Sequence, residues 1–173
     1  MKRVWLRGVT IGICAVCLMF GTNAYAASKF GIIDMGKVFN ALEKTKNSDK
    51  VLEQEGQKKE TERNAMIDEI KRLQDEMELM SEKGKEEKQA VIEEKRRKLA
   101  TYERDAREEL LRKRDVMARE IIEEIRLAVK QYAEQNDYAF IIEKGALVYG
   151  VDQADVSDKI ATDLNAKYKS GKK

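Results

Sequence analysis

The four residues Glu82–Lys85 read EKGK, and they separate two stretches in which nothing interrupts a helix. From about Lys37 to Ser81, and again from Glu86 to Gln135, the chain contains no proline, and Gly56 is the one interior glycine. At ~1.5 Å per residue, each helix would span about 65–75 Å. A glycine between charged residues is a typical signal for a tight reversal. The sequence therefore predicts a long antiparallel α-helical hairpin that reverses at EKGK.

Short runs of β-favouring residues lie on either side of this hairpin. Phe30–Ile33 (FGII) precedes it and is followed by Asp34, a residue type that often caps a helix. Tyr138–Glu143 (YAFIIE) and Ala146–Tyr149 (ALVY) follow the hairpin, and Lys144-Gly145 between them predicts a two-residue β-hairpin turn. The strands thus come from both ends of the chain.

A third helix is predicted near the C-terminus, because apolar residues recur there every four positions. They are Val156, Ile160, Leu164 and Tyr168. The predicted fold class is mainly α with a small β body, in which the long hairpin is inserted between the strands. We assign residues 27–50 and 125–168 to a composite body, 51–124 to the arm and 169–173 to a basic tail.

The body is small for an independently folding unit. It amounts to roughly 65 residues without a disulfide or metal, and bodies of that size seldom fold alone. Its strands would also leave exposed edges. Both arguments predict an oligomer in which several protomers pool their strands. The candidate oligomerisation residues are Phe30, Ile32, Ile33, Phe39, Phe140, Ile142, Leu147 and Tyr149.

The N-terminal segment has the order of a secretory signal peptide. Met1–Arg7 is basic, Gly8–Gly21 is apolar and uncharged, and Ala24-Tyr25-Ala26 supplies the small residues before a cut. We expect cleavage after Ala26 and export, the alternative being an uncleaved anchor. The segment holds three of the 34 Lys and Arg and none of the 32 Asp and Glu. The exported chain then has one more acidic than basic residue, which argues against nucleic-acid binding.

Few residues in the exported chain are suited to catalysis. The sequence contains no histidine, and both cysteines, Cys14 and Cys17, lie in the predicted signal. The usual general base, thiol nucleophile and imidazole ligand are therefore missing. No glycine-rich phosphate loop is present. We predict that the protein is not an enzyme, with no catalytic, cofactor-binding or metal-binding residues and no cofactor.

The far part of the arm carries more apolar surface than one helix–helix seam requires. Met66, Ile70, Leu73, Met77 and Met80 follow the 4–3 spacing of a heptad seam. The whole set either packs inside the hairpin or faces outward in part, as an adaptable methionine-rich surface for apolar partners. The candidate contact residues are Met66, Ile67, Ile70, Met77, Leu79 and Met80.

One level of the arm concentrates positive charge. If the hairpin reverses near residue 84, Lys71 and Arg72 lie level with the run Lys95–Lys98 (KRRK). The six cations Lys71, Arg72, Lys95, Arg96, Arg97 and Lys98 could attract an anionic lipid or polyanion. The other interpretation, which we favour, is a solvated face neutralised by neighbouring Glu and Asp.

The middle of the first long helix has no apolar side chain at all. Residues 53–64 read EQEGQKKETERN and would face 103–114 on the second helix, which offers only Ala106, Leu110 and Leu111. Gly56 adds backbone freedom. We predict that this stretch is a hinge centred on Gly56.

Motifs at both ends of the chain resemble those of the Skp/OmpH-like periplasmic chaperones. Asp34-Met35-Gly36-Lys37-Val38-Phe39 is similar to the family's helix start after its first strand, and Tyr138–Tyr168 resembles its closing strands and helix. The resemblance implies a homotrimer with a shared β-barrel and three helical arms around a cavity. It also implies an ATP-independent periplasmic holdase that keeps unfolded outer-membrane proteins soluble.

The charge of the arm departs from the family's best-known members, which are strongly basic. Residues 75–98 carry seven Lys and Arg against eight Asp and Glu, so no lipopolysaccharide site is carried over. Two other functions stay open. A periplasmic adaptor coiled coil would tether envelope components through its arms, and an anionic-polymer binder would lose affinity steeply with salt.

Overall fold

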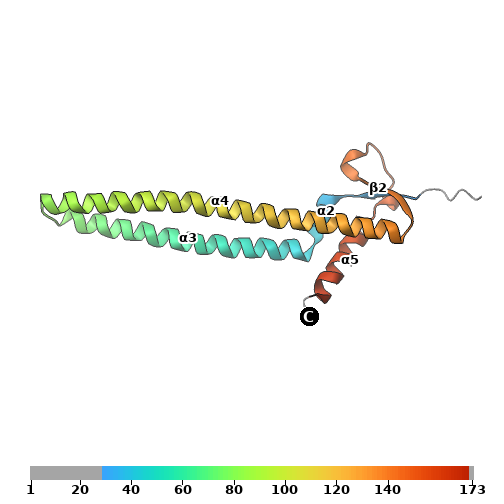
Figure 1. Cartoon of the computed structure of the whole chain (residues 1–173), viewed down its shortest axis with the longest axis horizontal. Coiled ribbons are helices and arrows are strands. Elements are labelled where there is room, and N and C mark those ends of the chain that lie inside the picture. Colours follow the sequence, from blue (N-terminus) through green and yellow to red (C-terminus); the bar gives the residue numbers. More distant parts are fainter. Residues whose placement is uncertain (1–28, 172–173) are drawn as a thin grey trace, which may run out of the picture.

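The computed structural model of the chain describes residues 29–171. The predicted signal segment, its cleavage site and the last residues of the basic tail lie outside the described residues. A long two-helix arm extends from a small body that holds both ends of the described chain (Figure 1). In chain order the elements are β1 (Lys29–Ile33), α2 (Met35–Ala41), α3 (Glu43–Glu78), α4 (Glu82–Gln135), β2 (Tyr138–Glu143), the 3₁₀ turns η1 (Lys144–Ala146) and η2 (Asp152–Ala154), and α5 (Ser157–Ser170).

The arm is the predicted helical hairpin, with α3 and α4 running side by side (Figure 1). The reversal, however, lies at residues 79–81, just before the predicted EKGK. Leu79 and Met80 close the last turn of α3 through their N–H groups, and Ser81 is extended at φ −67° and ψ 160°. Gly84 lies within the first turn of α4, where a Cβ would come 3.3 Å from the Cβ of Met80. The glycine therefore serves close packing at the tip rather than the reversal itself.

The first predicted helix is broken at Leu42, a break that the sequence did not predict. Leu42 is extended at φ −75° and ψ 133°, and its side chain is buried in the body. Asn165 of α5 spans the break: its Oδ1 accepts from the Glu43 N–H at 2.8 Å, and its Nδ2 donates to the Ala41 carbonyl at 3.1 Å. A distant side chain thus satisfies the backbone groups that the break exposes.

The predicted β-hairpin after the arm is wrong. Lys144-Gly145 lies in η1, residues 146–149 form no strand, and β2 pairs instead with β1 in parallel. A parallel pair needs a long crossover, and α2, α3 and α4 together supply it. The chain after η1 returns to the sheet, where the Val156 N–H donates to the Ile32 carbonyl at 2.9 Å.

The body has one apolar core where α2, the end of α4 and α5 meet. Asp34 caps α2 as predicted, since its Oδ1 accepts from the Lys37 N–H at 2.8 Å. The predicted third helix is confirmed as α5, and Val156, Ile160 and Leu164 of its apolar stripe lie in this core, whereas Tyr168 is half-buried outside it. The buried residues are Ile33, Val38, Leu42, Ile121, Ile125, Val156, Ile160, Ala161 and Leu164.

Candidate functional site

The middle of the arm interrupts the helix–helix seam. Along α3, Leu52, Gly56, Lys59, Arg63 and Met66 follow the same 4–3 spacing as the apolar seam nearer the tip. The three central positions, however, offer no apolar side chain that could fill the seam. The facing part of α4 therefore stays incompletely covered, and residues that would be buried in a full seam are only half-buried there. These are Tyr102, Ala106 and Leu110.

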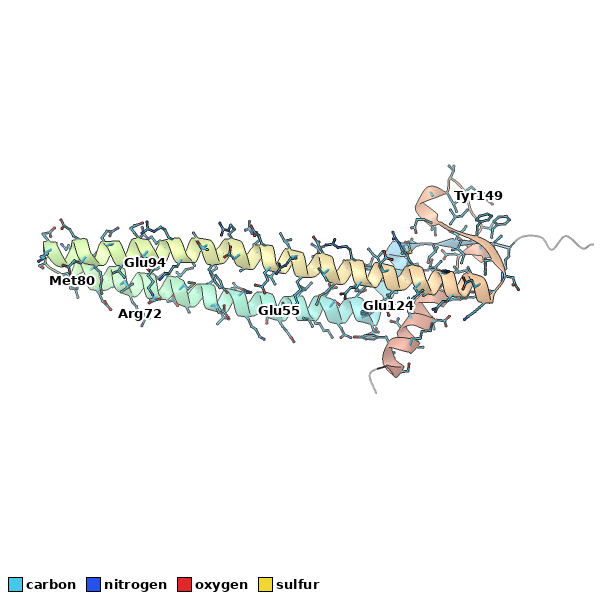
Figure 2. All side chains as sticks on the ribbon, viewed as in Figure 1. Glu55, Arg72, Met80, Glu94, Glu124 and Tyr149 are labelled. Atoms are coloured by element: carbon cyan, nitrogen blue, oxygen red, sulfur yellow. The ribbon has the colours of Figure 1, made fainter. Side chains whose placement is uncertain are left out.

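Polar contacts hold the two helices together where apolar packing is missing. Lys59 pairs with Glu109 at 2.7 Å and Arg63 with Glu103 at 2.6 Å. The predicted register placed Arg63 opposite residue 104, next to the Glu103 with which it pairs. Nearer the root, Lys113 pairs with Glu55, which Figure 2 labels on α3.

Tyr102 lies at the centre of this polar segment. Its hydroxyl oxygen is 2.7 Å from Glu62 Oε2 and 3.2 Å from the Lys59 carbonyl oxygen. Burial of the ring, and then the hydrogen bond to Glu62, raises the pKa of Tyr102 above its ordinary value. The phenol therefore stays protonated and remains a donor at neutral pH.

The unfilled seam opens a groove between α3 and α4, which we call the mid-arm groove. Its volume is about 670 Å³. A Cβ placed on Gly56 would meet no atom within 4 Å, so the space beside the glycine is open. A second groove of about 510 Å³ lies next to it and shares Lys59, Tyr102 and Ala106. The mid-arm groove is lined by Leu52, Lys59, Glu60, Arg63, Tyr102, Glu103, Ala106, Arg107, Leu110, Leu111 and Arg114.

The predicted apolar contact residues near the tip do not share one environment. Ile70 is buried between the helices, where it is 7% exposed, so its side chain is unavailable to a partner while the arm is paired. Met66, Ile67 and Met77 are half-buried. At the turn, Leu79 is 91% exposed, and Met80, labelled at the end of the arm in Figure 2, is exposed too. Both interpretations therefore apply in part: most of the set packs inward and the turn faces outward.

The predicted cationic level is largely paired with acids. The ion pairs are Lys71–Asp68 (3.6 Å), Lys95–Glu69 (2.7 Å), Arg96–Glu93 (3.3 Å) and Lys98–Glu94 (2.6 Å). Arg72 and Arg97 form no ion pair with any residue of the described range 29–171. The hydrogen bond from Lys95 lowers the pKa of Glu69, and that from Lys98 lowers the pKa of Glu94. This pattern favours the solvated, neutralised face.

The sheet of the body presents a separate apolar surface. The rings of Phe30 on β1 and Phe140 on β2 stack with centroids 5.9 Å apart, and both side chains are more than half exposed. Ile142 is exposed as well, and so is Tyr149, which Figure 2 labels. Four other predicted oligomerisation residues lie deeper: Ile33 is buried in the core, Phe39 packs against it, and Ile32 and Leu147 are half-buried.

Two exposed apolar residues near Tyr149 are not among those predicted from the sequence. Val148 is fully exposed and Val151 is 50% exposed, both beside Tyr149 in the irregular segment after η1. Val148 belongs to the apolar run Ala146–Tyr149, which the sequence assigns to a strand of the predicted β-hairpin, whereas Val151 lies outside that run.

Neither a metal site nor a membrane-spanning helix is found within residues 29–171. No three His, Cys, Asp or Glu side chains in this range are arranged to hold a metal ion. None of the helices described is both long and apolar enough to cross a membrane.

Comparisons with known proteins agree with this architecture. The sequence matches the family described as outer membrane protein (OmpH-like) over residues 29–164. No curated protein matches the chain. Among solved structures, the fold is similar to that of a putative outer membrane chaperone (OmpH-like) from Caulobacter crescentus CB15, with a TM-score of 0.75 at 13% identity over 85% of this chain and 89% of that one. The match covers most of the chain, from β1 into α5, and the chain therefore belongs to the OmpH-like outer membrane protein family.

Proposed function

We propose that the protein is an ATP-independent holdase chaperone of the periplasm, which keeps unfolded outer-membrane proteins from aggregating. The observation that carries the proposal is an arm of two long helices extending from a small body whose sheet leaves aromatic side chains exposed. Family membership and the likeness to a structure described as a putative outer membrane chaperone support it.

The proposed working unit is a homotrimer. Phe30 and Phe140 form a stacked apolar surface on a two-stranded sheet, and such a sheet is marginal by itself. The side chains of Val148 and Tyr149, in the segment after η1, are exposed too. Joining the strands of three copies into one barrel would cover these side chains and remove the open strand edges.

The mechanism follows from this assembly. Three arms fixed to one body would surround a space in which a client is separated from other clients, so that its apolar surface cannot aggregate. Client contacts along the arms must be weak and numerous, because release takes place without ATP. The exposed arm surface, on which charged side chains predominate, suits such contacts.

Aggregation of a denatured β-barrel protein tests the function. A urea-denatured outer-membrane protein is diluted into buffer with the purified chain, without nucleotide, and light scattering is followed. We expect suppression at about one trimer per client. Unchanged scattering at that ratio contradicts the holdase and favours the adaptor coiled coil, for which unfolded clients are irrelevant.

Native mass spectrometry tests the trimer. We expect three copies for the wild type and a shift to monomer in Phe30→Ser/Phe140→Ser, which removes the stacked pair. The control is Val51→Ser, which changes an exposed apolar residue on α3. A wild-type monomer, or an unchanged trimer in the double variant, contradicts the proposed interface.

A further inference from the structure

The mid-arm groove exists because the seam of α3 lacks side chains where it needs them. Gly56 occupies a seam position four residues after Leu52, and no atom lies within 4 Å of where its Cβ would be. Lys59 and Arg63, the next two seam residues, reach across to Glu109 and Glu103 and so do not fill the space. The result is a groove of about 670 Å³ in an arm that is packed at either end.

The floor of the mid-arm groove is apolar. Leu52 of α3 and Ala106, Leu110 and Leu111 of α4 line it, together with the ring of Tyr102. Leu111 is 52% exposed, so much of this apolar surface is in contact with solvent. An apolar side chain of another molecule would bury it, which is favourable in proportion to the apolar area removed from water.

The rim of the groove carries positive charge that the arm itself does not neutralise. Arg107 and Arg114 line the groove and form no ion pair or hydrogen bond through their side chains with residues 29–171. Of the two acids that line it, Glu103 is already paired with Arg63. Only Glu60 then offsets the two free guanidinium groups, so the rim favours an anionic occupant.

The spacing of the two arginines indicates an extended peptide. Seven residues of helix separate Arg107 from Arg114, a rise of about 10 Å at 1.5 Å per residue. In the polyproline II conformation, a major conformer of unfolded chains, three residues make one turn and rise about 9 Å, so that side chains at positions i and i+3 point to the same side. Acidic residues at positions i and i+3 of a peptide would therefore match both arginines. A lipid carries its charge at one end and would meet only one of them.

We propose that the mid-arm groove binds an extended segment of unfolded polypeptide with the pattern acidic–apolar–apolar–acidic. An apolar side chain enters the space over Gly56, and the flanking carboxylates pair with Arg107 and Arg114. The inference rests on the proposed holdase function and deepens it, because it gives the arm a local sequence preference in addition to enclosure.

Peptide binding tests the inference directly. Two fluorescein-labelled peptides, with Asp-Leu-Phe-Asp or Lys-Leu-Phe-Lys at the centre of the same serine–glycine flanks, are titrated with the full chain and followed by anisotropy. We expect the acidic peptide to bind about tenfold more tightly. Equal affinity for the two peptides, or no binding of either, overturns the proposal.

Variants with matched controls locate the site. Gly56→Leu fills the groove and is expected to lower the affinity for the acidic peptide about tenfold. Gln57→Leu adds the same side chain at the adjacent exposed position and should leave this affinity unchanged. Arg107→Gln/Arg114→Gln should abolish the preference for the acidic peptide. The control is Arg112→Gln/Arg119→Gln, which removes two exposed arginines at the same spacing outside the groove and should leave the preference for the acidic peptide unchanged. Equal behaviour within either pair overturns the proposal.

The same variants separate this inference from the proposed function. If the wild type suppresses client aggregation while Gly56→Leu and Gln57→Leu bind the peptide equally, the proposal that the groove binds peptide is wrong. The proposed holdase function is then unaffected. If the wild type fails to suppress aggregation, the proposed function fails and this inference with it. Displacement of the bound acidic peptide by phosphatidylglycerol vesicles, but not by phosphatidylcholine vesicles, identifies an anionic-lipid site and overturns the peptide proposal.

Discussion

The root of the arm and its middle are formed by the same two helices, but they are packed differently. At the root, Ile121 and Ile125 of α4 are almost completely buried, because α2 and α5 cover them. In the middle, Ala106 and Leu110 of the same helix stay half-buried beside a groove of about 670 Å³. Ion pairs between exposed side chains replace the apolar core there.

The difference in packing makes the root the stable part of the molecule and the middle of the arm the adaptable part. Buried apolar area provides most of the folding free energy, whereas exposed ion pairs contribute little. The body can therefore keep its shape while the middle of the arm opens or bends at low cost. Each prediction below tests one part of this comparison.

The largest expected effect is at the root. Ile125→Ala leaves a cavity in the body core and should lower the free energy of unfolding by about 2–5 kcal/mol. Leu110→Ala removes a side chain that is already half-exposed and should cost about 1 kcal/mol. Urea denaturation followed by circular dichroism compares the two. Similar losses would show that the middle is as tightly packed as the root.

The second effect concerns the join between the body and the arm. Leu42 precedes α3 but has no side-chain oxygen to cap it, and Asn165 of α5 takes that role. Asn165→Ala leaves the Glu43 N–H and the Ala41 carbonyl without their partner and should cost about 1–2 kcal/mol. Asn40→Ala, at an exposed position of α2, is the control in the same urea titration. An equal cost in both variants would rule out a special role for Asn165.

A third, local effect is expected at Gly56. Amide hydrogen exchange should be faster in residues 53–64 than in 66–80, because the first segment has no apolar seam. Gly56→Ala should slow exchange in 53–64 by favouring the helix by about 1 kcal/mol, since the new Cβ meets no atom within 4 Å. Exchange in 66–80 of the same variant is the internal control. Equal protection of the two segments in the wild type would refute the hinge.

The sequence predicts the parts of this structure that depend on local signals. Uninterrupted helix formers specify the two long helices, and complementary charges such as Arg63 and Glu103 agree with the register. The break at Leu42 could not be predicted in this way, because the side chain that satisfies it, Asn165, lies more than 120 residues away.

The errors in the body and in the groove have different causes. Lys144-Gly145 is a good local hairpin signal, but parallel pairing of β2 with β1 across the whole arm prevailed. The groove, in contrast, could have been predicted from the sequence. The 4–3 spacing that identified Met66 and Ile70 continues back through Arg63, Lys59 and Gly56, and following it would have located the missing seam.

The smallest expected effect is the pH dependence of the arm. Hydrogen bonds from Lys95, Lys88 and Lys59 lower the pKa values of Glu69, Glu76 and Glu109 below the ordinary 4.5. A carboxyl whose pKa is lower in the folded than in the unfolded state stabilises the fold fully above the unfolded value. That contribution is lost as the pH falls through the folded value.

Arm helicity in a thermal melt should therefore be constant from about pH 7 to about pH 5 and fall only below about pH 4.5. Because these carboxylates are exposed, each contributes little, and salt should weaken the effect further. Glu109→Gln should reduce the acid-induced loss, whereas Glu53→Gln, at an exposed position without an ion pair among residues 29–171, should not. A melt that is unchanged down to about pH 3 would mean that the ion pairs do not hold the middle of the arm together.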